Sequence, residues 1–348
     1  MSVEDQARKL LQEAIAGGIS DIHILPKKSS YNIYFRVSGK LHLFSNESLE
    51  WGKRFISYLK FLANLDVGEK RRPQSGSTPF QIKEECLELR LSTITNYLLL
   101  ESMVIRLLRP RISQETNLQS IFPKDVYRLR DLVRRKSGLI LFSGPVGSGK
   151  TTMIYQLLRQ RMDNEELQII TMEDPVEIFE PRFLQTEVNE RAQISYDLLI
   201  KSSLRHHPDI LMIGEVRDEE TARMIIRGAL TGHLMIATIH AKNSQGVIAR
   251  LEELQISRQQ LSQTLIGVIS QRLVPKFCPF CQGPCQLSCN FISQDRKRAS
   301  IFELMEGKTL HNYLLGQTSC FTTLNDKLRK AWAYGFIDQK TYRHFEII

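Results

Sequence analysis

The feature that most constrains this fold is the segment GPVGSGKTT at residues 144–152, which follows the apolar run GLILFS at 138–143. The segment fits the pattern GxxxxGK[ST], in which glycines let backbone N–H groups approach phosphate oxygens closely. The apolar run predicts a buried strand, and the residues from Lys150 onward predict a helix. A glycine loop between a strand and a helix N-terminus favours anions, so the segment indicates a nucleotide site in an α/β sheet.

Individual positions of this loop have expected roles. Lys150 is expected to neutralise the β- and γ-phosphates, and the Thr151 hydroxyl is expected to ligate Mg²⁺. The other residues expected to contact the nucleotide are Gly144, Pro145, Val146, Gly147, Ser148, Gly149 and Thr152. The alternative, an ordinary glycine turn, is disfavoured because four fixed positions rarely coincide by chance in a strand-to-helix setting.

A phosphate-binding loop needs a neighbouring acidic strand, and the segment DILMIGEV at 209–216 is the candidate. Its apolar residues end at Gly214, where an acidic metal ligand usually stands, and Glu215 follows. We therefore expect Mg²⁺ to be held partly through water, which suits a cation that loses its hydration reluctantly. Glu215 is the candidate general base for the attacking water, and the alternative is a solvated acid at a strand end.

Two further polar clusters accompany apolar strands, TMEDPVE at 171–177 and GHLMIATIHA at 232–241, the second with a histidine on either side of its strand. Ligand sites in α/β sheets lie at the carboxyl ends of strands, where we expect both clusters to fall. The candidate residues are Glu173, Asp174, His233 and His240. We expect Glu173 and His240, the latter as a sensor of the γ-phosphate, to take part in catalysis, and the other two to contact the nucleotide. The alternative for each histidine is a structural role.

The composition is that of an ordinary globular protein. Its 348 residues exceed what one hydrophobic core usually supports, which predicts two domains and an appendage. A net charge of +9 favours an anionic partner, which leaves nucleic acid, a membrane surface and an acidic protein face open. No apolar stretch is long enough to cross a bilayer, and the N-terminus lacks the apolar core of a signal peptide. We therefore expect a cytoplasmic protein.

The order of segments predicts the domain organisation. Residues 1–108 begin with a helix at 4–16 and continue with strand-like segments, which predicts a small mixed α/β domain. A polar stretch bounded by prolines at 109–123 predicts a linker. Strands and helices alternate from 124 to 277, which predicts a parallel sheet covered on both faces. A helix whose wet face is basic is expected at 124–136.

The C-terminal part contains a cysteine cluster and helical patterns. The segment CPFCQGPCQLSC contains Cys278, Cys281, Cys285 and Cys289, which could hold a structural zinc ion as thiolates. A reduced or occasionally oxidised cysteine cluster is the alternative. Cys86 and Cys320 are expected to be buried. Residues 290–348, which include IFELMEGKTLHNYLL, are predicted to form a helical subdomain.

Four motifs together resemble one family. They are GPVGSGKTT, TMEDPVE, LRHHPDILMIGEVRDEETA and TGHLMIATIHAKNS. In order and spacing they are similar to the Walker A loop, aspartate box, atypical Walker B and histidine box of the secretion and type IV pilus traffic ATPases. Segments at 20–24, 35–41 and 71–76 extend the resemblance into the N-terminal domain, so it covers most of the chain.

The resemblance implies a fold and an assembly. The expected parts are an N-terminal α/β (PAS-like) domain and a RecA-like P-loop domain, in hexameric rings with the nucleotide between the two domains. In this family two N-terminal arginines reach the γ-phosphate, and Arg90 and Arg106 match those positions by pattern. Thr95 and Leu100 stand where the family usually has proline and glycine, which leaves open that these are surface strand arginines.

The resemblance also implies a function. The chain is most similar to the competence-pilus assembly branch of Gram-positive bacteria, which predicts a hexameric motor that hydrolyses ATP to build a pseudopilus for DNA uptake. An inner-membrane platform protein (ComGB-like or PilC-like) is the implied partner, with the motor peripherally associated with the inner face of the membrane. Type II secretion and pilus retraction remain alternatives. So does a RecA-like ATPase that grips DNA, although the chain lacks a basic groove interleaved with aromatic residues.

Overall fold

The computed structural model describes residues 2–37, 40–82, 85–108, 119–189, 192–285, 289, 291–293, 296–317 and 320–347, without the side chains of 40, 85 and 86. The chain divides into two compact units. The first comprises Met1–Ile112 with Glu177–Phe179, and the second comprises the remaining residues. Most of the predicted linker at 109–123 lies outside the described residues. No described helix has both the length and the apolar character needed to span a bilayer.

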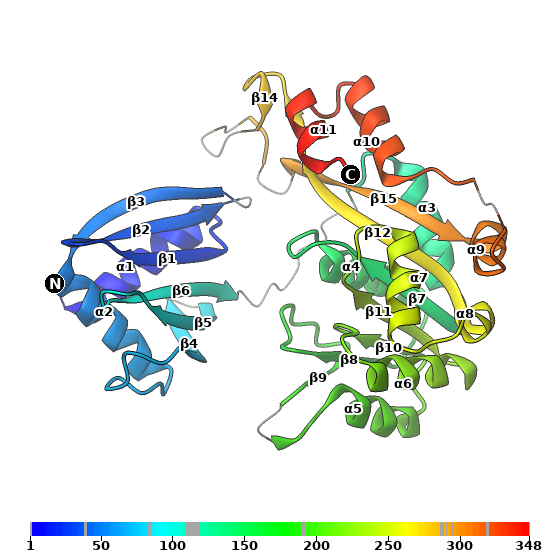
Figure 1. Cartoon of the computed structure of the whole chain (residues 1–348), viewed down its shortest axis with the longest axis horizontal. Helices are drawn as coiled ribbons and strands as arrows, with labels where there is room; N and C mark the ends of the chain where they lie inside the picture. The colour runs from blue at the N-terminus through cyan, green and yellow to red at the C-terminus, as the bar shows by residue number, and fades with distance from the viewer. Residues whose placement is uncertain are drawn as a thin grey trace. The chain divides into compact units, whose positions relative to one another are not determined.

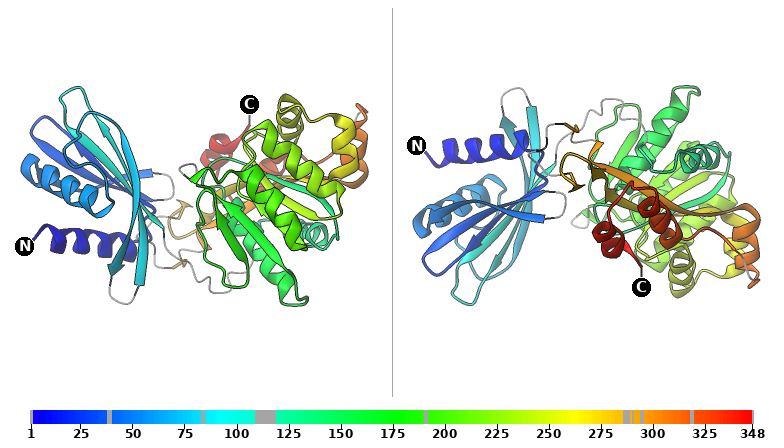
Figure 2. Two further views of the ribbon diagram at one scale, coloured as in Figure 1. Left: turned by 90° about the horizontal axis from the view of Figure 1, so that it is seen from below. Right: turned by 90° about the horizontal axis from the view of Figure 1, so that it is seen from above.

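The first unit is an antiparallel sheet with both of its helices on one face (Figure 2). The strand order is β3-β2-β1-β6-β5-β4. The elements are α1 (Val3–Ala16), β1 (Asp21–Pro26), β2 (Ser30–Val37), β3 (Lys40–Ser48), α2 (Leu49–Leu62), β4 (Gln74–Ile82), β5 (Glu85–Thr95) and β6 (Glu101–Leu108). Alternate residues of β2 and β6 are buried, as expected for a sheet with one face on a core. The predicted N-terminal helix is confirmed, and a capping box between Ser2 and Asp5 fixes its start.

The second unit is built on a seven-stranded sheet of order β15-β12-β7-β11-β10-β8-β9 (Figure 1). Every neighbouring pair is parallel except β12 and β15. Its strands are β7 (Gly138–Ser143), β8 (Ile169–Glu173), β9 (Leu184–Glu187), β10 (Ile210–Ile213), β11 (Leu234–Ile239), β12 (Leu265–Pro275) and β15 (Arg298–Glu306). The predicted parallel sheet is therefore present.

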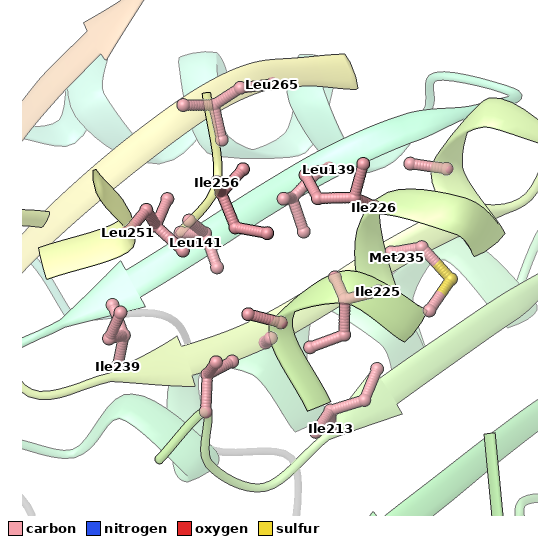
Figure 3. Packing of buried hydrophobic residues seen from close by; sticks show 14 of the residues in the cluster. Leu139, Leu141, Ile213, Ile225, Ile226, Met235, Ile239, Leu251, Ile256 and Leu265 are labelled. Carbon is pink, nitrogen blue, oxygen red and sulfur yellow. The ribbon is translucent and has the colours of Figure 1, made fainter. Parts of the chain in front are cut away.

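Helices cover both faces of this sheet because its central strands are apolar throughout. One face packs into a core that includes Leu139 and Leu141 of β7 (Figure 3). Ile140 and Phe142, which alternate with them, are equally buried, so the opposite face is covered too. The helices are α3 (Pro123–Val133), α4 (Lys150–Met162), α5 (Tyr196–Ser203), α6 (Glu219–Leu230), α7 (Ser244–Glu253) and α8 (Arg258–Thr264). Helix α3 buries its apolar side, as predicted for the basic segment.

The C-terminal part differs from the predicted helical subdomain. Residues 298–306, which the sequence predicts to be helical, form strand β15. They pair with β12 from Gly267 to Pro275 and so extend the sheet beyond residue 277. Strand β15 is buried almost throughout, so tertiary pairing overrides its local pattern. The elements around it are β13 (Phe277–Cys278), β14 (Gly283–Pro284), α9 (Gly307–Leu314), α10 (Leu324–Ala333) and α11 (Gln339–Phe345).

Glu303 of β15 joins the sheet to two helices. Its carboxylate is buried, and its two oxygens accept hydrogen bonds from the backbone N–H groups of Ser244 and Leu324, each at 2.7 Å. These are the first residues of α7 and α10, whose N–H groups have no partner within their helices. A carboxylate is also favoured there by both helix dipoles.

We predict that Glu303→Gln lowers the free energy of unfolding by about 2 kcal/mol, because an amide can accept only one of these two charge-assisted bonds. Denaturant unfolding of the full chain measures the loss. The matched control is Glu306→Gln on the same strand, which removes a more exposed ion pair with Arg128 and should cost less than about 1 kcal/mol. Equal losses in the two variants would contradict the role assigned to Glu303.

Candidate nucleotide-binding site

At several positions of the phosphate loop, the backbone conformation or the space available suits only glycine. Gly147 and Gly149 have φ values of 76° and 81°, and Gly149 is the N-cap of α4. A Cβ atom on Gly144 would lie 2.5 Å from the carbonyl oxygen of Gln271. The loop therefore closes tightly against β12 and presents the N-terminus of α4, as its sequence predicts.

Lys150 and Gln271 hold the loop in shape. The Lys150 ammonium donates to the carbonyl oxygens of Gly144 at 2.8 Å and Pro145 at 3.3 Å. Gln271 Nε2 donates to the carbonyl oxygen of Ser148 at 2.7 Å. The Ser148 hydroxyl and Gln271 Oε1 are buried with no hydrogen-bond partner among the described residues. Buried polar atoms without a hydrogen-bond partner, next to a glycine-rich loop, are consistent with a site that binds a polar ligand.

Side chains at the ends of three neighbouring strands form a linked cluster. Glu215 follows β10, and its Oε1 lies 3.2 Å from His240 Nε2, at the end of β11. Its Oε2 accepts a hydrogen bond of 2.7 Å from Arg217 Nε. Arg217 Nη1 donates to Asp174 Oδ2, beyond the end of β8, at 3.2 Å. Because β11 neighbours β7, this cluster lies on the same sheet edge as the phosphate loop.

Gly214 is explained by close packing of β10 against its surroundings. A Cβ atom there would lie 2.9 Å from the Tyr196 hydroxyl and 3.1 Å from the carbonyl oxygen of Met172 on β8. Any side chain here would have to displace the Tyr196 hydroxyl and press on the β8 backbone, which disfavours an acidic ligand where the sequence pattern usually has one. Glu215, one residue later, is one-fifth exposed and is the carboxylate that β10 presents.

Glu173 and Asp174 are neighbours in the sequence but have different hydrogen-bond partners. The Glu173 side chain is buried and accepts hydrogen bonds from the Tyr155 hydroxyl and, at 2.8 Å, from the Thr171 hydroxyl. Burial, with the nearby carboxylate, raises the pKa of Tyr155 far above its usual range, so the phenol stays a donor. Both of these hydrogen bonds end on Oε1 of Glu173.

His233 and His240 lie on either side of β11, as the sequence places them. His233 precedes β11, whereas His240 follows it, so the six-residue strand separates them. The carbonyl group of His233 accepts from the N–H of Gly138, at the start of β7, which confirms its position at the amino edge of the sheet. The expectation that the whole cluster lies at the carboxyl end of its strand is therefore wrong for His233, because the motif spans the whole strand.

The two candidate arginines lie opposite each other on β5 and β6 of the first unit. Arg106 Nε donates to Asp21 Oδ1 at 2.9 Å, and Asp21 is buried. Arg90 Nε is buried with no hydrogen-bond partner among the described residues. The arginines thus share one face of the sheet, and Asp21 fixes the direction of one of them.

The four clustered cysteines come together at the β13–β14 hairpin. Their ligand atoms all lie within 4.8 Å of one another, and the Cys278 and Cys289 sulfurs are 4.0 Å apart. Zn–S bonds of about 2.3 Å in a tetrahedron require sulfurs about 3.8 Å apart, so the set fits one zinc ion. A hydrogen bond from the Phe291 N–H lowers the pKa of Cys289 to about 7, which favours the thiolate. Cys320, expected to be buried, is exposed, and the side chain of Cys86 is outside the description.

Sequence reasoning missed several residues that shape the site. Arg217 stands in the motif LRHHPDILMIGEVRDEETA, but nothing in the sequence indicates its two carboxylate partners. Tyr155 lies on an apolar helix face, and Gln271 lies in the strand β12, which was not identified. The apolar run LIGVISQRLVP at 265–275 is the signal that could have located that strand.

The chain matches the family described as Type II/IV secretion system protein over residues 1–340. The competence protein ComGA of Halalkalibacterium halodurans is 39% identical over 341 residues, covering 97% of each chain. ComGA of Bacillus subtilis is 37% identical over 346 residues, covering 98% of this chain and 97% of the relative. Among solved structures, the pilus retraction motor PilT with bound ADP is similar with a TM-score of 0.69 at 25% identity, covering 98% of this chain and 97% of PilT. These similarities confirm the predicted α/β and RecA-like fold class.

We predict that Lys150→Ala weakens binding of a fluorescent ATP analogue about 10- to 100-fold, since a charge-assisted contact to phosphate contributes about 1.5–3 kcal/mol. Fluorescence titration measures the affinity. The control is Lys136→Ala, an exposed lysine before the amino end of β7, which should bind the analogue like the unaltered protein. Unchanged affinity in Lys150→Ala would remove the loop from nucleotide binding.

Proposed function

Because this chain belongs to the Type II/IV secretion system protein family, we propose that it is the hexameric motor that assembles a type IV-like competence pseudopilus for DNA uptake. Family membership confirms the resemblance inferred from the four motifs, and the protein is an ATP-hydrolysing enzyme. Two relatives of nearly equal length that are named competence proteins favour this role over type II secretion and pilus retraction. The observation that carries the proposal is the meeting of the phosphate loop and the Glu215 cluster at one sheet edge.

The phosphate loop is proposed to hold the substrate ATP. Its backbone N–H groups and Lys150 bind the phosphates, and the Thr151 hydroxyl ligates Mg²⁺. The residues present fit this ion, because a hydroxyl at the start of α4 and the carboxylates after β10 and β8 supply oxygen ligands directly or through water. Mg²⁺ when bound neutralises charge on the phosphate oxygens.

Glu215 is proposed to orient and deprotonate the attacking water. Its carboxylate is held from both sides, by Arg217 and His240, so its direction is fixed before the substrate binds. His240 follows β11, which neighbours β7 and its phosphate loop, and is proposed to respond to the γ-phosphate. Arg217 stays charged because its hydrogen bond to Glu215 raises its pKa above the usual value. Asp174 is the second carboxylate that this arginine orients.

The first unit is proposed to complete the site in a hexameric ring. Arg90 and Arg106 would stabilise charge on the transferring phosphoryl group, which suits planar guanidinium donors. The buried, unpaired Nε of Arg90 supports this role, because a donor without a partner loses free energy unless a ligand meets it. Closure of the units during hydrolysis would then transmit force to an inner-membrane platform protein, with the motor peripherally bound at the inner face of the membrane.

We expect Glu215→Gln to lower the rate of ATP hydrolysis about 10²- to 10⁴-fold while leaving ATP binding intact, because the amide cannot accept the proton of water. Steady-state hydrolysis is measured against protein concentration, with and without DNA. The matched control is Glu220→Gln, the same change at an exposed position of helix α6, which should keep full activity.

Varying the protein concentration and adding DNA in this measurement distinguish between the remaining candidate functions. A rate that rises cooperatively with protein concentration and ignores DNA supports sites completed in a ring. A DNA-stimulated rate that is already maximal at low concentration would assign the protein to the RecA-like class that grips DNA. Full activity in Glu215→Gln would remove this residue from catalysis.

The cysteine cluster is proposed to hold one structural zinc ion. We predict about one zinc per chain in the purified protein by elemental analysis, and a lower melting temperature after chelation, because metal binding contributes to folding. Cys278→Ser together with Cys281→Ser should abolish zinc content, whereas Cys320→Ser, outside the cluster, should not. Metal-free protein with an unchanged melting temperature would contradict the proposal.

A further inference from the structure

The turn between β5 and β6 exposes an unusual concentration of apolar side chains. Tyr97 is 85% exposed, Ile94 and Leu99 are each 60% exposed, and Leu98 lies between them at 43%. Solvent-exposed apolar residues are normally scattered singly, so a cluster at a hairpin tip indicates a surface that binds something. We propose that this tip, with the basic loop beside it, is the surface that docks the protein on an anionic lipid bilayer.

The turn is rigid, although its residues face solvent. The Asn96 side chain accepts hydrogen bonds of 3.0 Å from the N–H groups of Leu98 and Leu100, and the Ser102 hydroxyl donates to the carbonyl of Ile94 at 2.8 Å. Leu99 has a φ of 58°, a conformation that is costly for a branched apolar residue. The sequence thus keeps a large apolar side chain exposed where asparagine or glycine would fit better, which points to a function for that side chain.

A basic loop, residues 66–72, is fixed against this turn. Lys70, Arg71 and Arg72 are exposed in it. The Thr95 hydroxyl donates to the carbonyl of Lys70. Buried Lys60 donates at 2.7 Å both to the carbonyl of Glu69 and to the carboxylate of Glu101, the first residue of β6. The apolar tip and the basic loop therefore form one rigid surface rather than two independent segments.

The acidic residues of the loop, Asp66 and Glu69, accept hydrogen bonds from its own backbone N–H groups. Asp66 Oδ1 accepts from the N–H groups of Gly68 and Glu69, and Glu69 Oε1 accepts from those of Arg71 and Arg72. Glu101 is paired with Lys60. Asp66 is exposed and Glu69 is partly exposed, so the three basic and two acidic side chains of the loop leave it a net charge of +1.

Two more lysines lie at the same end of the sheet. Strand β1 runs antiparallel to β6, with Ile24 opposite Met103, so the turn that follows β1 emerges beside the β5–β6 turn. Lys27 and Lys28 in that turn are exposed. The end of the sheet thus combines a central apolar tip with a basic surround.

This combination matches the interface of an anionic membrane better than a protein surface. Tyrosine and leucine insert into the boundary between headgroups and acyl chains, while lysine and arginine are attracted to anionic headgroups. Each basic residue near such a surface strengthens binding by about fivefold, and the attraction falls as salt screens it. The inference deepens the membrane association in the proposed function by naming the element responsible.

The test is co-sedimentation of the full chain with vesicles of phosphatidylcholine containing about 30 mol% phosphatidylglycerol, compared with phosphatidylcholine alone. The variants are Leu99→Asn and the double change Arg71→Ala/Arg72→Ala. Asparagine tolerates the φ of this position, so Leu99→Asn should fold at least as stably while losing apolar contact. We expect about tenfold weaker binding for Leu99→Asn and about twentyfold for the double variant.

The matched controls change equivalent residues elsewhere on the same unit. Leu43→Asn alters a leucine of β3 with the same 60% exposure. Arg8→Ala/Lys9→Ala removes two exposed charges from α1, where Arg8 contacts Gln81 at the other end of β4. Vesicle binding equal to that of the unaltered protein is expected for the apolar control, and at most a small loss for the basic one.

The outcomes distinguish this inference from its alternatives. Equal loss in test and control variants, or no preference for phosphatidylglycerol, would overturn it. If Leu99→Asn instead changes the oligomeric state in analytical ultracentrifugation and leaves vesicle binding intact, the tip is an interface between copies. ATP hydrolysis is measured in parallel and should persist in every variant, so loss of lipid binding with intact hydrolysis separates this inference from the proposed motor function.

Discussion

Parallel pairing of β7, β11, β10 and β8 is the constraint on which the site depends. Parallel strands end at the same edge of a sheet, so residues that follow them meet even when they are distant in sequence. The phosphate loop follows β7, Glu215 and Arg217 follow β10, and their partners His240 and Asp174 follow β11 and β8. Without this strand order the motifs would not come together at one edge of the sheet. Their apolar strands supply the buried area that fixes the order.

Strands β12 and β15 extend the sheet beyond β7 and support the phosphate loop from that side. Strand β12 lies next to β7, and its Gln271 holds the phosphate loop by a hydrogen bond to Ser148. Strand β15 pairs with β12, and its Glu303 accepts hydrogen bonds from the first residues of α7 and α10. Helix α7 begins four residues after His240. The C-terminal part of the chain is therefore part of the support of the site.

The first unit uses a buried ion pair to organise an exposed surface. Lys60 and Glu101 lose their hydration on folding, and hydrogen bonds of 2.7 Å compensate for that cost. The pair links α2, the basic loop and the start of β6. At the other end of β6, Asp21 orients Arg106, which lies opposite Arg90. One small sheet thus carries the proposed membrane-docking surface at one end and the candidate phosphate-binding arginines toward the other.

The sequence by itself determined the phosphate loop and the parallel sheet, because glycine spacing and apolar runs are local signals that need no tertiary context. The family followed from the resemblance of four motifs to known sequences. The sequence also located Glu215, whose place follows from its strand. Chain order also puts His233 before β11 and His240 after it. Only the tertiary structure decided that residues 298–306 form β15 and which groups partner Arg217 and Gln271, because pairing between distant segments overrides local propensity.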